Sequence, residues 1–311
     1  MSAKQRWEIR AAVARRVGRY RRITAESGTA TTVVSLDLFE PNNFWIEFWL
    51  YCLQDFEKLG AWPEGFMRRV SAYAQSTQQL TVDLAYPGVA ADWPDNGDIF
   101  ELYPSYLPVP ELNDLLDEAI EAASAYWFKP AWDESTVSFA LNTHTYSLPS
   151  DVKNLRAVYV RSGSSYGWNR YNGWKVEGQP GAYVLKTTGE ISGDAALSYE
   201  ASLDWSTDPA TDASYLNVVS SPATNEHAYE QWARAFMVEY CIEKIHEKLM
   251  NEGDKQKANR HWNLMRFAKT KMDEIAQWHA QPRLSATVTK PLWAEHGDDL
   301  RGRAYSTALR K

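Results

Sequence analysis

The sequence predicts an α+β fold, in which an antiparallel helical core carries two inserted small antiparallel β units and an extended C-terminal arm. Three segments repeat apolar residues every three or four positions, as amphipathic helices do. The two long segments between them alternate apolar and polar residues and are interrupted by Gly and Pro, as short strands are. The helices carry the cleaner apolar stripes, so we expect them to pack together.

The predicted order is helix, β unit, helix, β unit, helical hairpin and arm. The predicted bounds are residues 1–22 for a basic N-terminal helix, 23–109 for the first β unit, 110–128 for a central helix, 129–222 for the second β unit, 223–281 for the hairpin and 282–311 for the arm. The arm has little periodicity, and we expect it to lie outside the core.

Apolar stripes define each helix. The first helix repeats Ile9, Val13 and Val17, and its arginines take the other faces. The central helix follows Pro110, which suits a first helical turn, and its stripe comprises Leu112, Leu115, Leu116, Ala119, Ile120 and Ala123. The hairpin has one stripe of Val238, Ile242, Ile245 and Leu249, a break at Gly253, and a second stripe of Ala258, Trp262, Met265, Ala268, Met272 and Ile275.

Residues 43–51, NFWIEFWLY, are the most aromatic stretch of the first β unit. Their alternation predicts a strand with Phe44, Ile46, Phe48 and Leu50 on one face and Trp45, Glu47, Trp49 and Tyr51 on the other. Both faces are apolar apart from Glu47, and an exposed large aromatic forfeits roughly 1.5–3 kcal/mol of burial. We therefore predict that Trp45, Trp49 and Tyr51 contact a neighbouring subunit.

The other strands are predicted from shorter patterns. RRVSAYAQSTQQLTVDLAYP is expected to form two strands joined by the polar turn AQSTQQ, and DNGDIFELY a turn followed by a strand. In the second β unit the strand candidates are TVSFALNTHTYSLPSD, LRAVYVRSG, YVLKTT and AALSYE.

Composition excludes several classes of protein. Of 311 residues, 44% are hydrophobic and 23% charged, which is ordinary for a globular chain. No stretch approaches the about 18 apolar residues that span a bilayer, so we expect no membrane contact. Arg10, Arg15 and Arg16 stand where a signal peptide would be apolar. Two distant cysteines, Cys52 and Cys241, predict reduced thiols and assembly in a cytoplasm.

Charge is unevenly spread along the chain. The formal net charge is -7, yet residues 1–22 hold eight basic side chains and one acidic one, and residues 283–311 hold six basic and three acidic ones. The remaining residues therefore carry a strong negative charge. Basic ends on an acidic body indicate termini that face something negative, or a solvated helix face and a loose tail.

No motif predicts catalysis or a cofactor. Phosphate-binding glycine loops, GxSxG and HExxH are absent. Glu243 and His246 have the ExxH spacing of di-iron bundles, but a second ExxH is missing, so an exposed helix face is the preferred interpretation over a metal enzyme. In DWPDNGD, acidic residues recur every third position, which favours a turn over a calcium loop. We expect no enzyme, no metal and no cofactor.

The loop SYGWNRYNGW contains Trp168, Tyr171 and Trp174 beside glycines. Aromatic faces in loops pack in cores and interfaces or stack on ligands. The first interpretation is preferred here, and a glycan-binding virion or surface module using these three residues is the alternative function. With 14 Trp and 17 Tyr and no catalytic constellation, the chain is more typical of an assembly component than of an enzyme.

RRVSAYAQSTQQLTVDLAYP, GDIFELY and PELNDLLDEAIEAAS, followed later by YSLPSDVKNLRAVYV, resemble the head-to-tail adaptor (connector, neck) proteins of tailed bacteriophages. The resemblance implies a virion structural protein of the neck, between capsid and tail. It would form a ring, typically of twelve copies, under the portal protein, bind a tail or nozzle protein, and surround the channel through which double-stranded DNA passes without sequence readout.

The basic termini would then meet an acidic portal rim, because DNA that must slide is not held by strong phosphate contacts. Portal-contact candidates are Arg15, Arg16, Arg19, Trp293, Arg301 and Arg303. Contact between the termini and DNA stays open at this point, as do the copy number and the tail partner.

Overall fold

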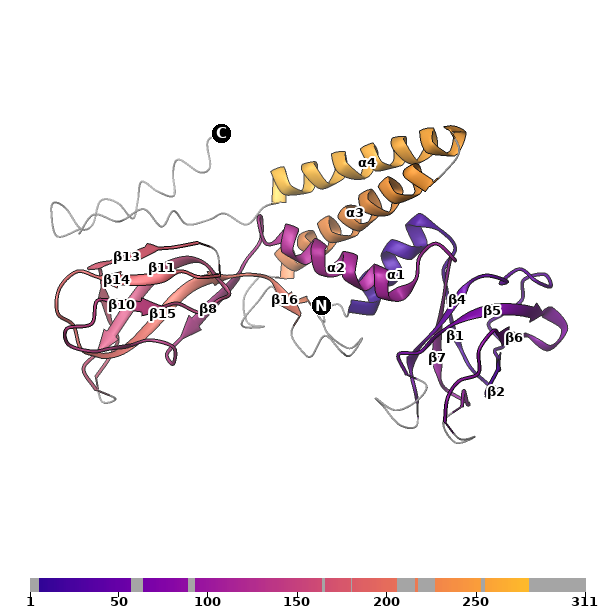
Figure 1. Cartoon of the computed structure of the whole chain (residues 1–311), viewed down its shortest axis with the longest axis horizontal. Helices are drawn as coiled ribbons and strands as arrows, with labels where there is room; N and C mark the ends of the chain where they lie inside the picture. The colour runs from indigo at the N-terminus through magenta and orange to yellow at the C-terminus, as the bar shows by residue number, and fades with distance from the viewer. Residues whose placement is uncertain are drawn as a thin grey trace. The chain divides into compact units, whose positions relative to one another are not determined.

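The computed structural model describes residues 6–56, 64–88, 93–163, 166–179, 181–205, 216–217, 227–252 and 255–279 (Figure 1). The chain divides into two compact units. Unit 1 comprises residues 1–126, 204–217 and 227–280, and unit 2 comprises residues 127–203, 218–226 and 281–311.

The prediction of a helical core with two small β units is wrong. The described part of the chain is mostly β-sheet, with antiparallel sheets of seven, five and three strands and a short two-stranded ladder beside four α-helices. The fold is a β-rich α+β fold. Helices have a strong periodic signal, whereas many of these strands are two to four residues long and leave little pattern to detect.

Unit 1 contains the seven-stranded sheet, in the order β1-β7-β4-β5-β6-β3-β2. Its strands are β1 Arg21–Thr24, β2 Ser27–Thr29, β3 Thr32–Val34, β4 Trp49–Gln54, β5 Met67–Ala74, β6 Gln79–Val82 and β7 Ile99–Tyr103. The predicted hairpin is confirmed as β5 and β6, joined by a 3-10 turn at Gln75–Thr77, and the strand predicted in DNGDIFELY is β7. A core of side chains such as Leu50, Val70 and Phe100 is fully buried within the unit.

The four helices also belong to unit 1. They are α1 Arg6–Val17, α2 Val109–Ala123, α3 His227–Glu252 and α4 Lys255–His279, and α3 runs beside α4 (Figure 1). Helix α3 also packs on α1 and α2. The predicted stripes of α1, α2 and α3 are largely buried, for example at Ile9, Val13 and Leu116. In the stripe predicted for α4, only Ala268 is buried and Trp262 is 46% exposed. The short ladder pairs β16 Asp204–Trp205 with β17 Leu216–Asn217.

Unit 2 contains the other two sheets. The five-stranded sheet has the order β12-β11-β15-β8, with β9 also pairing β15, and the three-stranded sheet has the order β10-β14-β13. Their bounds are β8 Lys129–Asp133, β9 Ser138–Phe139, β10 Thr145–Ser147, β11 Val152–Arg161, β12 Asn169–Tyr171, β13 Trp174–Glu177, β14 Val184–Thr187 and β15 Gly193–Ala201. Val158 and Leu197 from one sheet share a buried core with Leu185 from the other.

The strand predicted for NFWIEFWLY is wrong over its first half. Residues 42–47 form successive turns, and β4 starts only at Trp49. Asn43 and Glu47 have φ values of 63° and 72°, which no strand residue adopts. The amide of Phe44 donates to the carbonyl of Pro41 over 3.1 Å, as a turn requires.

The structure also bears on the two cysteines and on the expectation that no segment spans a membrane. Cys52 and Cys241 are both buried free thiols, as predicted. Among the described helices, none has the length and hydropathy of a membrane-spanning segment. The predicted arm at 282–311 lies outside the described residues.

Candidate functional site

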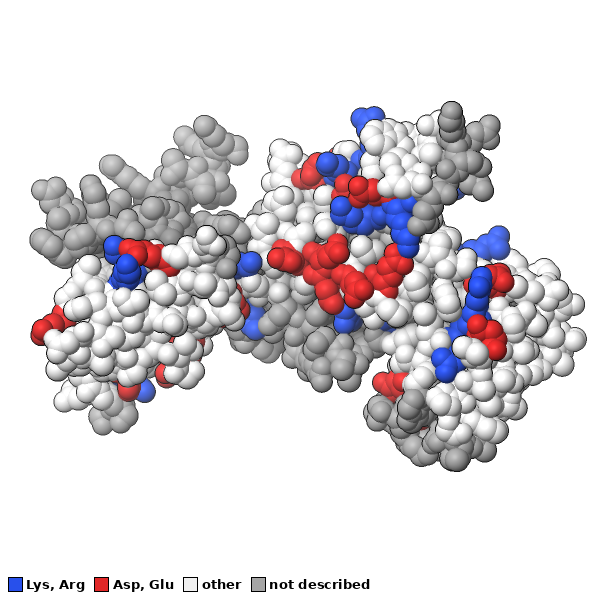
Figure 2. All heavy atoms as spheres, in the orientation of Figure 1, with Lys and Arg blue, Asp and Glu red and all other residues white. Residues whose placement is uncertain are grey.

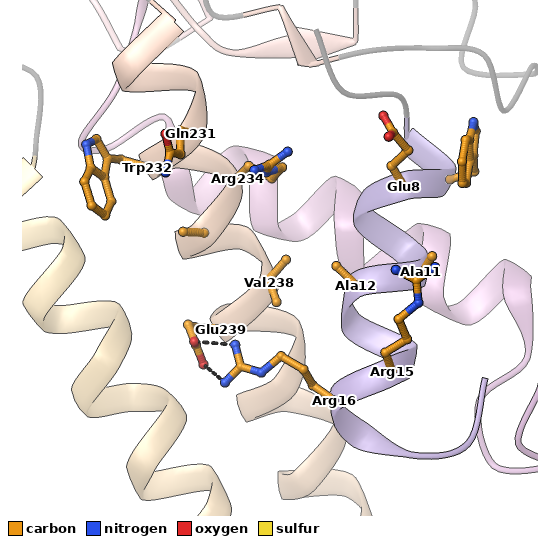
Figure 3. Close-up of a pocket in the computed structure, with 12 residues that line it drawn as sticks. Glu8, Ala11, Ala12, Arg15, Arg16, Gln231, Trp232, Arg234, Val238 and Glu239 are labelled. Carbon is orange, nitrogen blue, oxygen red and sulfur yellow. Dashed lines mark hydrogen bonds and ion pairs between the residues drawn. The ribbon is translucent and has the colours of Figure 1, made fainter. Parts of the chain in front are cut away.

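A groove runs between α1 and α3 in unit 1 (Figure 3). Its volume is about 480 Å³. Small side chains, among them Ala11, Ala12 and Ala235, form its floor, and longer polar and aromatic ones form its rims. The rim residues are Trp7, Glu8, Arg15 and Arg16 from α1 and Gln231, Trp232, Arg234, Val238 and Glu239 from α3. The small side chains let α1 and α3 approach closely, and the longer ones place charged groups at the edges of the groove.

Arg16 closes the groove on one side. Its guanidinium donates two hydrogen bonds to the buried carboxylate of Glu239, over 2.5 and 3.1 Å (Figure 3). Such a two-point pair fixes both side chains. One of the predicted portal-contact arginines is therefore engaged in holding α1 against α3.

A second hollow lies beyond the C-terminal turn of α1 and has a volume of about 330 Å³. Arg15 lines both hollows, and Arg19, Arg21 and Glu40 line this one as well. The chain turns sharply here at Gly18, where a Cβ atom would come within 2.3 Å of the Tyr106 hydroxyl. Tyr106 donates from this position to the carbonyl of Val17 over 3.2 Å, so the end of α1 is fixed.

Four arginines around these hollows lie over aromatic rings. Their guanidinium-to-centroid distances are 5.0 Å for Arg15 on Tyr20, 4.5 Å for Arg19 on Phe44, 4.5 Å for Arg21 on Phe39 and 4.2 Å for Arg22 on Trp7. Arg21 also donates to the carbonyl of Asp37 over 2.5 Å. We call Arg15, Arg19, Arg21 and Arg22 the arginine surface.

Three of these guanidinium groups have no acceptor among the residues that the structure describes. Within the described ranges, Arg15, Arg19 and Arg22 make neither a hydrogen bond nor an ion pair. A ring face attracts a guanidinium but leaves its N–H groups open, and those groups match a carboxylate or phosphate in two-point contacts. The rings therefore hold these side chains in place while their donors stay available to an anion.

A buried polar network supports this surface from below. The fully buried Arg10 donates to Glu101 over 2.7 Å, to the Tyr103 hydroxyl over 2.8 Å and to Asn113 over 3.1 Å. Tyr20 donates to the other oxygen of Glu101 over 2.5 Å. Burial and the neighbouring Glu101 carboxylate raise the pKa of Tyr20, so its hydroxyl stays a donor. Since Arg15 lies on Tyr20, the network fixes the base on which that cation rests.

The predicted subunit contacts of Trp45, Trp49 and Tyr51 lose their basis. Trp45 is buried in the core of unit 1, with its indole N–H donating to Glu40 over 3.1 Å. Tyr51 is buried with the Arg10 guanidinium 5.0 Å from its ring. Trp49 is half-buried and donates to the carbonyl of Ser105 over 2.9 Å. Trp45 and Tyr51 are therefore covered within the unit, and Trp49 is covered in part.

The loop aromatics of unit 2 separate into two groups. Tyr171 and Trp174 pack against the core of the unit, and the Tyr171 hydroxyl donates to Thr188 over 3.1 Å. Trp168 instead lies next to Trp132, with ring centroids 6.2 Å apart. The predicted trio therefore does not form one site.

The expectation of an exposed helix face at Glu243 and His246 is wrong. Glu243 is half-buried and His246 is buried, with its Nδ1 3.1 Å from Nδ1 of His261 on α4. In the part of the chain that the structure describes, no group of three or more His, Cys, Asp or Glu could hold a metal ion. Trp293, Arg301 and Arg303 lie outside the described residues.

Sequence reasoning identified Arg15 and Arg19 but missed Arg21, Arg22 and Arg234. The first two could have been found, since they extend the basic run across Tyr20 into β1. Arg234 comes from α3, and only the packing of α3 on α1 places it at the groove. Searches of protein-family models, curated proteins and solved structures found no match.

Proposed function

We propose that this chain is a virion structural protein, a head-to-tail adaptor that forms a ring between the portal and the tail of a bacteriophage. The observation that carries the proposal is the arginine surface, where guanidinium groups held on aromatic rings have open donors. A surface of this kind fits a partner that presents carboxylates, as an acidic portal rim would.

Three of the four segments that resemble adaptor proteins fall in unit 1. RRVSAYAQSTQQLTVDL forms the β5–β6 hairpin, GDIFELY covers β7, and PELNDLLDEA lies in α2. All three belong to unit 1, as does the arginine surface. The fourth segment, YSLPSDVKNLRAVYV, falls on β10 and β11 in unit 2, so the positional support comes from the three segments that share unit 1 with the arginine surface.

A carboxylate partner fits the arginine surface better than DNA does. Glu40 lines the same hollow as Arg19, and Glu8 lines the same groove as Arg15. Figure 2 shows acidic side chains gathered over α2, where Asp114, Glu118 and Glu121 are exposed. A long phosphate chain would meet these acids, whereas a compact carboxylate cluster would not. The same acids suit a protein past which DNA slides.

The test is binding to purified portal rings from the same phage. The intact chain should assemble with the portal into rings of a single copy number, read by native mass spectrometry. The double variant Arg15→Ala/Arg19→Ala should bind the portal about tenfold more weakly or worse, because two charge-assisted contacts are lost. Binding of the intact chain should also weaken as salt rises.

Arg170→Ala is the matched control, since Arg170 is an exposed arginine in unit 2. It should bind the portal as the intact chain does. A chain that stays monomeric and ignores the portal would end the proposal. Equal losses in the double variant and in Arg170→Ala would show that the arginine surface is not the contact.

A further inference from the structure

The outer face of the five-stranded sheet in unit 2 carries an aromatic cluster. Trp132 from β8 lies 5.0 Å from Tyr159 of β11 and 6.2 Å from Trp168, measured between ring centroids. We call Trp132, Tyr159 and Trp168 the aromatic corner. Its side chains point away from the core of the unit, because the neighbours Val158 and Leu197 on alternate positions fill that core.

The strand register brings the corner together. Trp132 pairs with Ser198 of β15, and Tyr159 pairs with Ala196 on the same strand. Positions 196 and 198 share one face of the sheet. The small side chain of Ala196 is fully buried on this face, which leaves room for large rings beside it. Residues more than twenty positions apart thus form one surface.

The rings are held in fixed orientations. The indole N–H of Trp132 donates to Glu134 over 2.7 Å, and the Arg161 guanidinium lies 4.4 Å from the centre of the Trp168 ring. The two indole planes meet at 83°. Trp132 nevertheless remains 48% exposed, so a large apolar ring is kept rigid and open to solvent. A ligand would find a preformed surface, with little entropy left to lose on binding.

The polar groups beside the corner are balanced in charge. Arg161 donates to Asp194 over 3.0 Å, and Glu134 accepts from Trp132. Arg170, exposed on β12, lies opposite Tyr159 in the register. Two cations and two anions give no net attraction for phosphates or sulfates. They do offer donors and acceptors for hydroxyl groups.

We propose that the aromatic corner binds a neutral glycan. A pyranose ring has an apolar C–H face that stacks on an exposed indole and a rim of hydroxyls that bond to charged side chains at its edge. The corner supplies both, with Trp132 as the stacking ring and Arg161 and Asp194 as the polar edge. This activity is independent of the adaptor function, because its residues lie in unit 2.

The test is a screen of the intact chain against an array of neutral oligosaccharides built from glucose, galactose, mannose and N-acetylglucosamine, with heparin and single-stranded DNA as acidic probes. At least one neutral oligosaccharide should bind, and any binding of the acidic probes to the arginine surface of unit 1 should be unchanged in Trp132→Ala. Saturation-transfer NMR on that oligosaccharide should then show loss of the signal in Trp132→Ala, with affinity about tenfold lower or worse.

Trp278→Ala is the matched control, because Trp278 on α4 is 73% exposed and belongs to unit 1. It should bind like the intact chain. Trp132→Phe should recover part of the affinity, which separates a lost stacking ring from a misfolded unit. No neutral binder, binding of the acidic probes alone, or equal losses in Trp132→Ala and Trp278→Ala would each overturn the proposal.

Discussion

The arginine surface of unit 1 and the aromatic corner of unit 2 both place a guanidinium over an aromatic ring, but the two surfaces differ in net charge. In both, a guanidinium lies over an aromatic ring, at 5.0 Å for Arg15 on Tyr20 and at 4.4 Å for Arg161 on Trp168. Arg161 is also paired with Asp194, whereas Arg15 has no acceptor among the described residues. The ring fixes an arginine in each case, and the presence of a carboxylate decides what the arginine can still bind.

The difference extends below the two surfaces. In unit 1 the arginine surface rests on a fully buried ion pair, Arg10 with Glu101, at 0% exposure of both side chains. In unit 2 the corner lies on apolar strands, and its ion pair is half-exposed. A change in charge should therefore cost unit 1 much more stability than unit 2.

The largest expected effect comes from Glu101→Gln. The substitution keeps the shape of the side chain but leaves the buried Arg10 charge without its carboxylate. We expect a loss of about 3–5 kcal/mol in the free energy of unfolding, measured by urea denaturation. Hydrogen exchange should quicken in α1 and β7 and stay unchanged in β11 and β15 of unit 2.

Glu47→Gln is the control for this change. Glu47, in the turn before β4, forms an exposed ion pair with Arg69 on β5. Removing its charge should therefore lower the free energy of unfolding by less than about 1 kcal/mol. If Glu101→Gln proved as mild as the control, the buried network would not support the arginine surface.

The next effect is a pH dependence of stability that arises at His246 in unit 1. Burial, with smaller contributions from the neighbouring His261 and Arg260, lowers the pKa of His246 to about 4 from the 6.5 expected in an unfolded chain. Between these values the unfolded state binds more protons than the folded state, so stability is complete above pH 6.5 and is lost as the pH falls towards 4. The loss should reach at most about 3 kcal/mol.

Urea denaturation at pH 7 and pH 4.5 measures this loss. His246→Gln should remove the contribution of this histidine, whereas the pKa of Asp98, raised to about 6 by burial, acts in the opposite direction in both proteins. His144→Gln, at an exposed histidine of unit 2, should leave the difference between the two pH values unchanged. An equal loss of stability in His246→Gln would place its origin elsewhere.

The sequence predicted the helices of unit 1 better than it predicted the arginine surface in the same unit. Each helix has a stripe of its own, and Ile9 or Leu116 needs no distant partner to be recognised as buried. The arginine surface was visible in part, because Arg15 and Arg19 crowd one short segment. The buried network below it could not be predicted, since Tyr20 and Arg10 contact Glu101 across sequence separations of 81 and 91 positions.

The aromatic stretch NFWIEFWLY shows how alternation can mislead. Its alternating residues fit a strand, but Pro41 and Asn42 directly before it and Asn43 at its start favour a turn, and Asn tolerates a positive φ. The aromatic corner could not be predicted at all, because Trp132 and Tyr159 become neighbours only through the register of β8 and β11 on β15.

The smallest expected effect would make unit 2 resemble unit 1. Asp194→Asn removes the carboxylate that neutralises Arg161 and leaves the guanidinium on the Trp168 ring, which is the condition of Arg15 on Tyr20. Because Asp194 is 49% exposed, we expect a stability loss below about 1 kcal/mol. The variant should gain weak, salt-sensitive binding to heparin that the intact corner lacks, measured by retention on a heparin column at low ionic strength.

Glu190→Gln is the control, because it removes an exposed carboxylate of unit 2 that makes no hydrogen bond or ion pair among the described residues. Asp133→Asn is unsuitable, because Asp133 accepts three local hydrogen bonds from Ser135 and Thr136. Equal retention of Asp194→Asn and Glu190→Gln would mean that net charge, and not the pairing of one stacked arginine, separates the two surfaces.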